Sequence, residues 1–396
     1  MARYDCRRQL GVDRHIFRRT GKNNPLGTFS PPAKPFDSGL AAPKIGIRIR
    51  QEICMNSRSP AKTSSAAAGP GSADDLEVPA RLVPVPTTVS AEMQKIIGAP
   101  RRPTWKLQPK TNEEWKSIVD AAAAIAIGTL PGICKRRRVT FEKIVVDGVR
   151  AFMVTPKEIA PENQDRLLIH LHGGCYVLSP GEAGLPEAIL MAGFGRFKVI
   201  SVDYRMPPEA YFPAALDDAV AVWKAALKIA DPGKMAVFGT SAGGALTLAL
   251  VLRAKELGLP LPAAIAPGTP MSDATKTGDT FHTNEMLDNV LVSSNGFCDA
   301  GAAFYANGHD LADPLLSPVY GDLRGFPPTI LTSGTRDLLL SNTVRVHRKL
   351  RQAGVEADLN VYEGQAHAQY LVNDAAPETA EAFGDIAAFF DKHLAR

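Results

Sequence analysis

The chain has 396 residues, of which 45% are hydrophobic and 22% are charged, with five cysteines and a net charge of +4. These values are typical of a soluble globular protein and exclude full-length disorder, a collagen-like repeat and a disulfide-rich scaffold. The longest largely apolar stretches, 121–130 and 242–252, are shorter than the roughly 20 residues that a membrane-spanning helix needs. We therefore expect no membrane span.

Positive charge is concentrated near the N-terminus. Residues 1–72 contain 13 Lys/Arg and four Asp/Glu, so that residues 73–396 carry a net charge of −5. No basic excess remains on the foldable part, and we expect no nucleic-acid partner. Residues 1–75 show no sustained apolar periodicity, which is typical of a disordered or extraneous extension. A mitochondrial-type presequence and a true start at Met55 are the alternatives, and no secretory apolar region follows either methionine.

The five cysteines are dispersed along the chain and form neither a C-x-x-C motif nor a metal-ligand spacing; they are Cys6, Cys54, Cys134, Cys175 and Cys298. An odd and dispersed set predicts reduced thiols in a cytoplasmic protein, without a metal site.

Two helices are predicted before the chain reaches its first strand. Ser90 is a candidate N-cap for the first helix. Thr111 precedes the second, which is predicted to run to about Ile127 and to stop at Gly128 and Pro131.

From residue 139 onward, short apolar runs alternate with helical patterns. The predicted strands are 141–146, 150–155, 167–172, 198–203, 235–238, 263–267, 329–333 and 358–362, and the predicted helices include 214–228, 242–257, 341–353 and 377–394. Several strands are continuously apolar, which is typical of a largely parallel sheet buried on both faces. The alternation predicts an α/β architecture.

The sharpest local motif is G-x-S-x-G between a predicted strand and a predicted helix. It comprises Gly239, Ser241 and Gly243. A turn this tight holds the serine in a strained conformation above the sheet, and side chains at the two glycine positions would collide with neighbouring elements. We therefore predict Ser241 as a nucleophile; the alternative is a purely structural Gly-Ser turn.

A second glycine motif follows the strand that ends near residue 171. Acyl transfer creates an oxyanion, and backbone N–H groups fixed in advance stabilise it. We assign this role to Gly173 and Gly174, with the N–H of Ala242 as the third donor. His172 is interpreted as an anchor of this loop and not as a base.

An activated serine needs a base and an acid, which in this type of fold follow the serine in the order acid and then histidine. His367 lies in the loop after the last predicted strand, and Asp337 follows the preceding strand. The alternatives are that Asp337 only caps a helix and that Glu363 is the acid. His282 and His309 lie in an irregular region and are candidates for the substrate pocket.

Seven segments together carry a family resemblance. They resemble the hormone-sensitive-lipase-like (bacterial family IV) esterases of the α/β-hydrolase fold, and Thr240 before the serine is similar to their GTSAGG branch. The matching segments are 172–175, 203–209, 212–217, 239–244 and 313–318 and the loops that contain Asp337 and His367.

The resemblance implies an α/β-hydrolase catalytic domain over residues 136–396 and a helical cap built largely from residues 76–135. It also implies a Ser241–His367–Asp337 triad, an oxyanion hole at Gly173, Gly174 and Ala242, and neither a cofactor nor a metal. A homodimer is compatible with it. Cys175 stands where the family usually has a third glycine, and we expect altered packing there with retained activity.

The implied activity is that of a serine carboxylesterase acting on small-molecule esters with short to medium acyl chains, or on lactones, through an acyl-enzyme. The cap residues Trp105, Trp115, Ile118 and Ile125 favour an apolar pocket, unless they are simply core. The alternatives are an amidase or peptidase, an acyltransferase, or a non-catalytic ligand-binding protein of the same fold.

Overall fold

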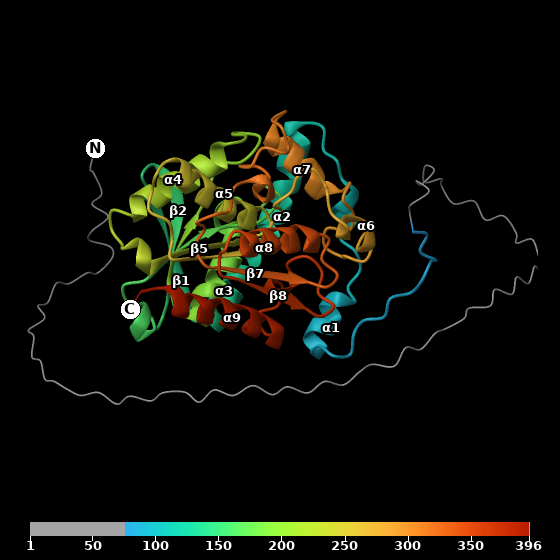
Figure 1. The fold of residues 1–396 in the computed structure, drawn as a ribbon. Helices are drawn as coiled ribbons and strands as arrows, with labels where there is room; N and C mark the ends of the chain where they lie inside the picture. The colour runs from blue at the N-terminus through green and yellow to red at the C-terminus, as the bar shows by residue number, and fades with distance from the viewer. Residues whose placement is uncertain (1–75, 396) are drawn as a thin grey trace, which may run out of the picture. The chain divides into compact units, whose positions relative to one another are not determined.

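An eight-stranded sheet forms the centre of the computed structural model, which describes residues 76–395 (Figure 1). The predictions for residues 1–75, including the start at Met55, lie outside the described residues. The strand order is β1-β2-β4-β3-β5-β6-β7-β8. The strands are β1 (Val139–Val146), β2 (Val149–Pro156), β3 (Leu167–Leu171), β4 (Lys198–Val202), β5 (Met235–Thr240), β6 (Ala264–Gly268), β7 (Thr329–Gly334) and β8 (Ala357–Tyr362). All eight predicted strands are present.

The sheet is parallel from β4 to β8, whereas β2 pairs antiparallel with both β1 and β4. Every residue of β3, β5 and β6 is buried, because helices cover both faces of the sheet there. The edge strand β1 exposes several side chains instead. The prediction of a mostly parallel α/β sheet is confirmed.

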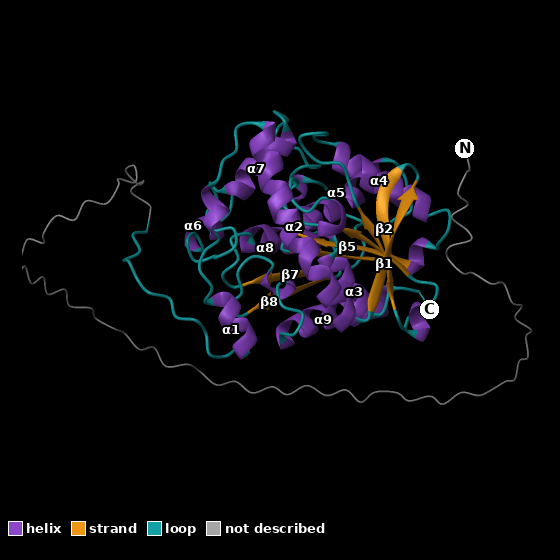
Figure 2. Ribbon diagram, turned by 180° about the vertical axis from the view of Figure 1, so that it is seen from behind, coloured by secondary structure: helices purple, strands orange, loops and turns teal. Residues whose placement is uncertain are grey.

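Helices cover the sheet from two sides (Figures 1 and 2). On one face lie α3 (Pro186–Gly195) and α9 (Pro377–His393). On the other face lie α4 (Ala214–Ala226), α5 (Ala242–Glu256) and α8 (Leu340–Gln352). Helix α3 was not among the predicted helices, because its buried residues form one continuous run, 187–192, and therefore show no amphipathic period.

The N-terminal helices are α1 (Ala91–Ile97) and α2 (Asn112–Arg137). Ser90 caps α1 as predicted, and Thr111 forms a capping box with Glu114 at the start of α2. The predicted end of α2 is wrong, since the helix continues through Pro131 to Arg137.

Packing explains why α2 does not stop early. Leu130 is buried beyond the predicted stop, and Arg136 and Arg137 both pair with Asp374 near the start of α9. These tertiary contacts outweigh the local cost of a proline within the helix. Because α2 crosses residue 135, the division between a cap segment and a catalytic domain at that point stays a prediction.

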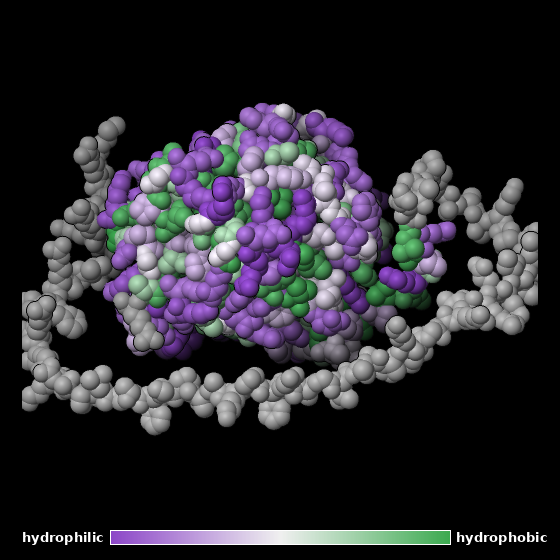
Figure 3. Space-filling model, in the orientation of Figure 1, coloured by the Kyte–Doolittle hydropathy of each residue, from purple (hydrophilic) through white to green (hydrophobic). Residues whose placement is uncertain are grey.

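Among the described residues, α2 is long and apolar enough to cross a membrane by length and composition. Most of its side chains are exposed, and its buried residues are Trp115, Ala123 and Leu130. Such a helix is weak evidence on its own, and the absence of a membrane span stays a prediction. The face of the molecule in Figure 3 is mostly polar, with apolar side chains in small separate groups.

A long insertion between β6 and β7 carries α6 (Thr280–Thr283) and α7 (Phe297–Ala306). In Figure 1, α1, α6 and α7 gather at one end of the sheet. Trp115 of α2 stacks on Phe304 of α7 with ring centroids 4.9 Å apart and contacts Phe297 at 5.2 Å. This insertion, called the cap insertion below, therefore packs against α2, and a cap built largely from the N-terminal helices stays a prediction.

Short 3-10 helices connect several of these elements. They are η2 (Pro103–Lys106), η3 (Pro161–Asn163), η4 (Gly181–Gly184), η5 (Pro232–Lys234), η6 (Pro318–Tyr320) and η7 (Gln369–Leu371).

Candidate active site

Ser241 occupies a tight turn between β5 and α5. Its backbone angles are φ 63° and ψ −120°, a region that non-glycine residues rarely adopt. A Cβ atom on Gly239 or Gly243 would lie 2.0 or 1.8 Å from the carbonyl oxygen of Leu171 in β3. Both glycines are therefore sterically required, as the sequence predicts. The turn is also fixed by hydrogen bonds, because the Ser241 N–H donates to Gly268 (2.9 Å) and its carbonyl accepts from Met271 (3.0 Å).

A buried polar network supports this turn from below. The Thr240 hydroxyl donates to Glu187 (2.6 Å) and lies 2.7 Å from the hydroxyl of Tyr370. Glu187 also contacts His170 (3.1 Å), whose other ring nitrogen lies 2.9 Å from the Ser201 hydroxyl. The threonine of the motif therefore has a structural role, because it joins the nucleophile strand to α3 and to the loop after His367.

Asp337 and His367 come together at the carboxyl ends of β7 and β8. Nδ1 of His367 lies 3.1 Å from Oδ1 of Asp337, and both residues are buried. Oδ1 also accepts the N–H of Leu339 (2.8 Å). The rival acid Glu363 is exposed. The geometry thus favours Asp337 as the partner of the histidine.

The carboxyl group of Asp337 is held in its ionised form. Burial by itself would raise its pKa, but the charge of His367 and the hydrogen bonds from His367, Thr269 and the Leu339 N–H outweigh burial. The pKa of Asp337 consequently lies below its usual value. A negative Asp337 keeps a proton on Nδ1 of His367 and leaves the other ring nitrogen free to act as a base.

Thr269 is a site residue that no sequence motif predicts. Its hydroxyl donates to Oδ2 of Asp337 and lies 3.2 Å from Nδ1 of His367. Ser333 also donates to Oδ2 of Asp337 (2.8 Å). Thr269 directly follows Gly268, the acceptor for the Ser241 N–H, so it links the acid–base pair to the nucleophile turn. Its only sequence signal is its place after a predicted strand.

Ser241 and His367 emerge from the same edge of the sheet. No hydrogen bond joins the Ser241 hydroxyl to His367 within residues 76–395. In serine hydrolases without substrate such bonds are often long, and they tighten when the reacting complex forms.

The predicted oxyanion donors lie beside the serine. A Cβ atom on Gly173 would lie 3.4 Å from Cβ of Ser241. In the described part of the chain, the N–H groups of Gly173 and Gly174 make no hydrogen bond, and Ala242 is the first residue of α5, where N–H groups have no intrahelical acceptor. All three donors are free to bind a substrate oxygen.

Cys175 occupies the position of the family's third glycine with φ 55°, a left-handed conformation that glycine adopts without strain. Its sulfur is bonded to Cys298 at the start of α7. The prediction of five reduced thiols is therefore wrong for these two residues. The partners are 123 residues apart, so no local spacing could reveal the pair. The cytoplasmic location depends on reduced thiols and stays a prediction.

The disulfide between Cys175 and Cys298 links the oxyanion loop covalently to α7, and its presence can be tested. Peptide mapping without reductant should recover the Cys175 and Cys298 peptides linked. The Cys175→Ala/Cys298→Ala variant should lose about 2–4 kcal/mol of unfolding free energy, because the cross-link closes a long loop. Cys134→Ala is the control, since this thiol is free. Separate alkylated peptides from unreduced protein would contradict the pairing.

His172 anchors the oxyanion loop, as predicted. Its Nδ1 lies 2.8 Å from the Gly173 carbonyl oxygen, and its ring stacks on Tyr204 at 4.1 Å. Tyr204 in turn donates its hydroxyl to the His172 carbonyl (2.6 Å). Burial lowers the pKa of His172 to about 4.

The lowered pKa of His172 predicts a loss of stability in acid. In the unfolded chain His172 becomes protonated as the pH falls below 6.5, whereas in the folded chain it stays neutral until about pH 4. Between these values the unfolding free energy should fall by up to about 3 kcal/mol through this group alone. The wild-type and His172→Asn proteins should therefore differ in the slope of unfolding free energy against pH in this window. Parallel curves would contradict the prediction.

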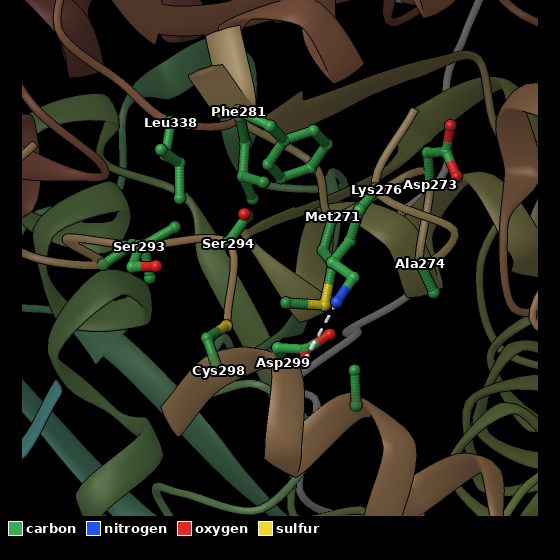
Figure 4. A pocket seen from close by; sticks show the side chains of 13 residues that line it. Met271, Asp273, Ala274, Lys276, Phe281, Ser293, Ser294, Cys298, Asp299 and Leu338 are labelled. Atoms are coloured by element: carbon green, nitrogen blue, oxygen red, sulfur yellow. Dashed lines mark hydrogen bonds and ion pairs between the residues drawn. The ribbon is translucent and has the colours of Figure 1, made fainter. Parts of the chain in front are cut away.

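A pocket lies beside the nucleophile turn and the loop that carries Asp337 (Figure 4). It contains about 380 Å³ of empty space, part of it open to solvent. Met271 and Leu338 connect it to the site, since the first donates to Ser241 and the second follows Asp337. Lys276 reaches across it toward Asp299, with 3.4 Å between Nζ and Oδ2.

The residues predicted to form an apolar pocket do not line this one. Trp115 is packed against α7, and Ile125 is 74% exposed on α2. His282 lies on α6 and His309 packs against Phe212, so neither lines the pocket. The insertion between β6 and β7 supplies most of the lining instead. Within the described residues, no cluster of His, Cys, Asp or Glu could hold a metal ion.

Comparisons with known proteins agree with this geometry. Residues 168–371 match a family model described as the alpha/beta hydrolase fold. The chain is 32% identical over 247 residues to an esterase of Acinetobacter venetianus, which covers 61% of this chain and 80% of that protein. It is 30% identical over 237 residues to an acetyl-hydrolase of Streptomyces hygroscopicus, and this match covers 59% of this chain and 79% of that protein.

Solved structures give the same result. The crystal structure of an esterase E25 has a TM-score of 0.79 and 44% identity, and the match covers 81% of this chain and 100% of that one. An esterase from the bacterial hormone-sensitive lipase family has a TM-score of 0.67 and 28% identity, and the match covers 77% of this chain and 99% of that one. The chain belongs to the α/β-hydrolase family, in its hormone-sensitive-lipase-like group of esterases. The resemblance drawn from the sequence motifs is confirmed.

Proposed function

We propose that this chain is a serine carboxylesterase that hydrolyses esters with short to medium acyl chains through a covalent acyl-enzyme. The observation that carries the proposal is the buried Asp337–His367 pair at the sheet edge where Ser241 sits in a strained turn beside free N–H donors. Nucleophile, base, orienting acid and oxyanion donors are the four parts that acyl transfer to serine requires.

The reaction follows from these positions. His367 takes the proton of the Ser241 hydroxyl while the serine oxygen bonds to the ester carbon, and the carbonyl electrons move onto the oxygen facing Gly173, Gly174 and Ala242. The intermediate collapses, the bond between the acyl carbon and the alcohol oxygen breaks, and His367 gives its proton to the leaving alcohol oxygen. Water then attacks the acyl carbon while His367 takes its proton. The bond between the acyl carbon and the Ser241 oxygen breaks, His367 returns the proton to that oxygen, and the carboxylic acid is released.

The pocket beside the site supports a substrate with one small apolar branch. The pocket is small and partly open, and apolar side chains form much of its wall, among them Met271, Phe281, Leu291 and Leu338. The relatives named as an esterase and an acetyl-hydrolase support the same class of substrate.

A panel of p-nitrophenyl esters from acetate to laurate, with lactones and p-nitroanilides beside them, tests the proposal. The short esters should have the highest kcat/KM, and the anilides should be turned over far more slowly. Faster cleavage of anilides would indicate an amidase, and alcohol-dependent transfer without acid release would indicate an acyltransferase. Ser241→Ala serves as the blank. No turnover of any ester by the folded wild-type protein would overturn the proposal.

A further inference from the structure

Asp288 lies between α6 and α7 in the insertion that joins β6 to β7, and it is fully buried, yet none of the reaction steps uses it. Its carboxylate accepts four backbone N–H groups. Oδ1 binds the N–H groups of Val290 (2.7 Å) and Leu291 (3.0 Å), which fix the side chain on its own loop. Oδ2 reaches the two loops that carry the catalytic acid and base.

A single oxygen atom of Asp288 serves both loops. Oδ2 accepts the N–H of Leu338 (2.9 Å), the residue after Asp337, and the N–H of His367 itself (3.2 Å). We propose that Asp288 is a positioning residue, which sets the separation of the catalytic base and acid by holding their backbones on one carboxylate oxygen. The inference rests on the proposed function, since it assumes that Asp337 and His367 form the working pair.

The contacts require an ionised carboxylate. A protonated carboxyl would place a donor against N–H groups, whereas an anion accepts all four. Burial and the charge of Asp337 raise the pKa of Asp288, while the charge of His367 and the backbone N–H groups oppose this. The negative charge of Asp288 therefore stabilises the protonated imidazole of His367.

The next residue extends this connection to the N-terminal helix. The Asn289 side-chain amide donates to the carbonyls of Ile96 (3.0 Å) and Ala99 (3.0 Å) at the end of α1. Its oxygen accepts from Gln369 (2.7 Å), two residues after His367. Gln369 also accepts the N–H of Ala366 (2.8 Å). The end of α1 and the histidine loop are thus joined through one asparagine.

Asp288→Asn tests the proposal, because the amide keeps the shape but turns a donor toward two N–H groups. The assay uses a p-nitrophenyl ester that the wild type hydrolyses. We expect kcat to fall on the order of 10²-fold, because the reacting groups are misplaced. KM should stay within about twofold of the wild-type value, because the pocket keeps its shape. The acid limb of kcat/KM against pH should also move to lower pH, because the imidazole loses a stabilising negative charge.

Thr280→Val is the matched control. Thr280 also ties the cap insertion to the acid loop, since its hydroxyl donates to the Leu338 carbonyl (3.0 Å) and accepts the Ser341 N–H (2.9 Å), but it makes no contact with the His367 loop. We expect this variant to have a lower melting temperature than the wild type but the same kcat and the same pH profile. A kcat loss in Thr280→Val as large as in Asp288→Asn would overturn the positioning role, and so would wild-type kcat and pH profile in Asp288→Asn.

Asn289→Ala provides the second variant if Asp288→Asn does not fold. This variant keeps the carboxylate of Asp288 but loses the hydrogen bonds of Asn289 to Gln369 and to the end of α1. We therefore expect kcat to fall several-fold, while the acid limb of kcat/KM against pH stays in place. Unchanged kcat in this variant would overturn the proposal in that case. Absence of ester hydrolysis by the wild type would count against the proposed function and not against the positioning role.

Discussion

Ser241→Ala is expected to lower kcat for ester hydrolysis by roughly 10⁶-fold, the scale on which loss of a serine nucleophile acts in a hydrolase. The Ser241 hydroxyl makes no hydrogen bond among the described residues, and alanine keeps the Cβ atom that the turn accommodates. The melting temperature should therefore stay close to that of the wild type. Hydrolysis of a p-nitrophenyl ester and a thermal unfolding curve measure both effects.

A neighbouring serine supplies the control for this variant. Ser272 is fully buried on the loop after β6, and its hydroxyl donates to the Asn342 carbonyl (3.2 Å). Ser272→Ala should cost some stability and retain kcat within about threefold, because it removes a structural hydrogen bond and no reacting atom. Activity of Ser241→Ala within tenfold of the wild type would show that another residue attacks the ester.

Asp337→Asn is expected to lower kcat by about 10⁴-fold, since the amide no longer keeps the proton on Nδ1 of His367. It also disturbs a carboxylate that accepts from Leu339, Thr269 and Ser333. The unfolding free energy should fall as well, because buried acceptors are lost. Steady-state kinetics and denaturant unfolding separate the two effects.

Glu363→Gln is the matched control for the acid. Glu363 is the carboxylate nearest to His367 in sequence, but it is exposed, and Nδ1 of His367 contacts Asp337 instead. This variant should keep kcat within about twofold. A loss of activity in Glu363→Gln with retained activity in Asp337→Asn would reverse the assignment of the acid.

Local spacing explains why the nucleophile turn and the sheet could be predicted from the sequence. The steric demands at Gly239 and Gly243 act between residues close in the chain or on adjacent strands, and they leave a readable pattern of glycines between a strand and a helix. Continuously apolar runs likewise identify strands that are buried on both faces.

Features that depend on distant contacts could not be predicted. The cystine joins Cys175 to Cys298, and Asp288 meets His367 from 79 residues away. Propensity indicated that α2 stops at Gly128, whereas ion pairs with Asp374 carry the helix further. Thr269 bridges acid and base from a loop whose sequence has no distinguishing motif. The cystine and the Asp288 contact depend on how the insertion between β6 and β7 folds over the sheet, whereas the end of α2 depends on the loop before α9.

Covalent labelling tests the central claim most directly. The folded wild-type protein is treated with a fluorophosphonate, digested and mapped by mass spectrometry, with Ser241→Ala treated alongside. A single adduct on the Ser241 peptide, absent from the variant, is the predicted result, because only an activated serine beside oxyanion donors attacks such a reagent at an appreciable rate. An adduct on a different residue, or equal labelling of both proteins, would contradict the assignment of Ser241 as the nucleophile.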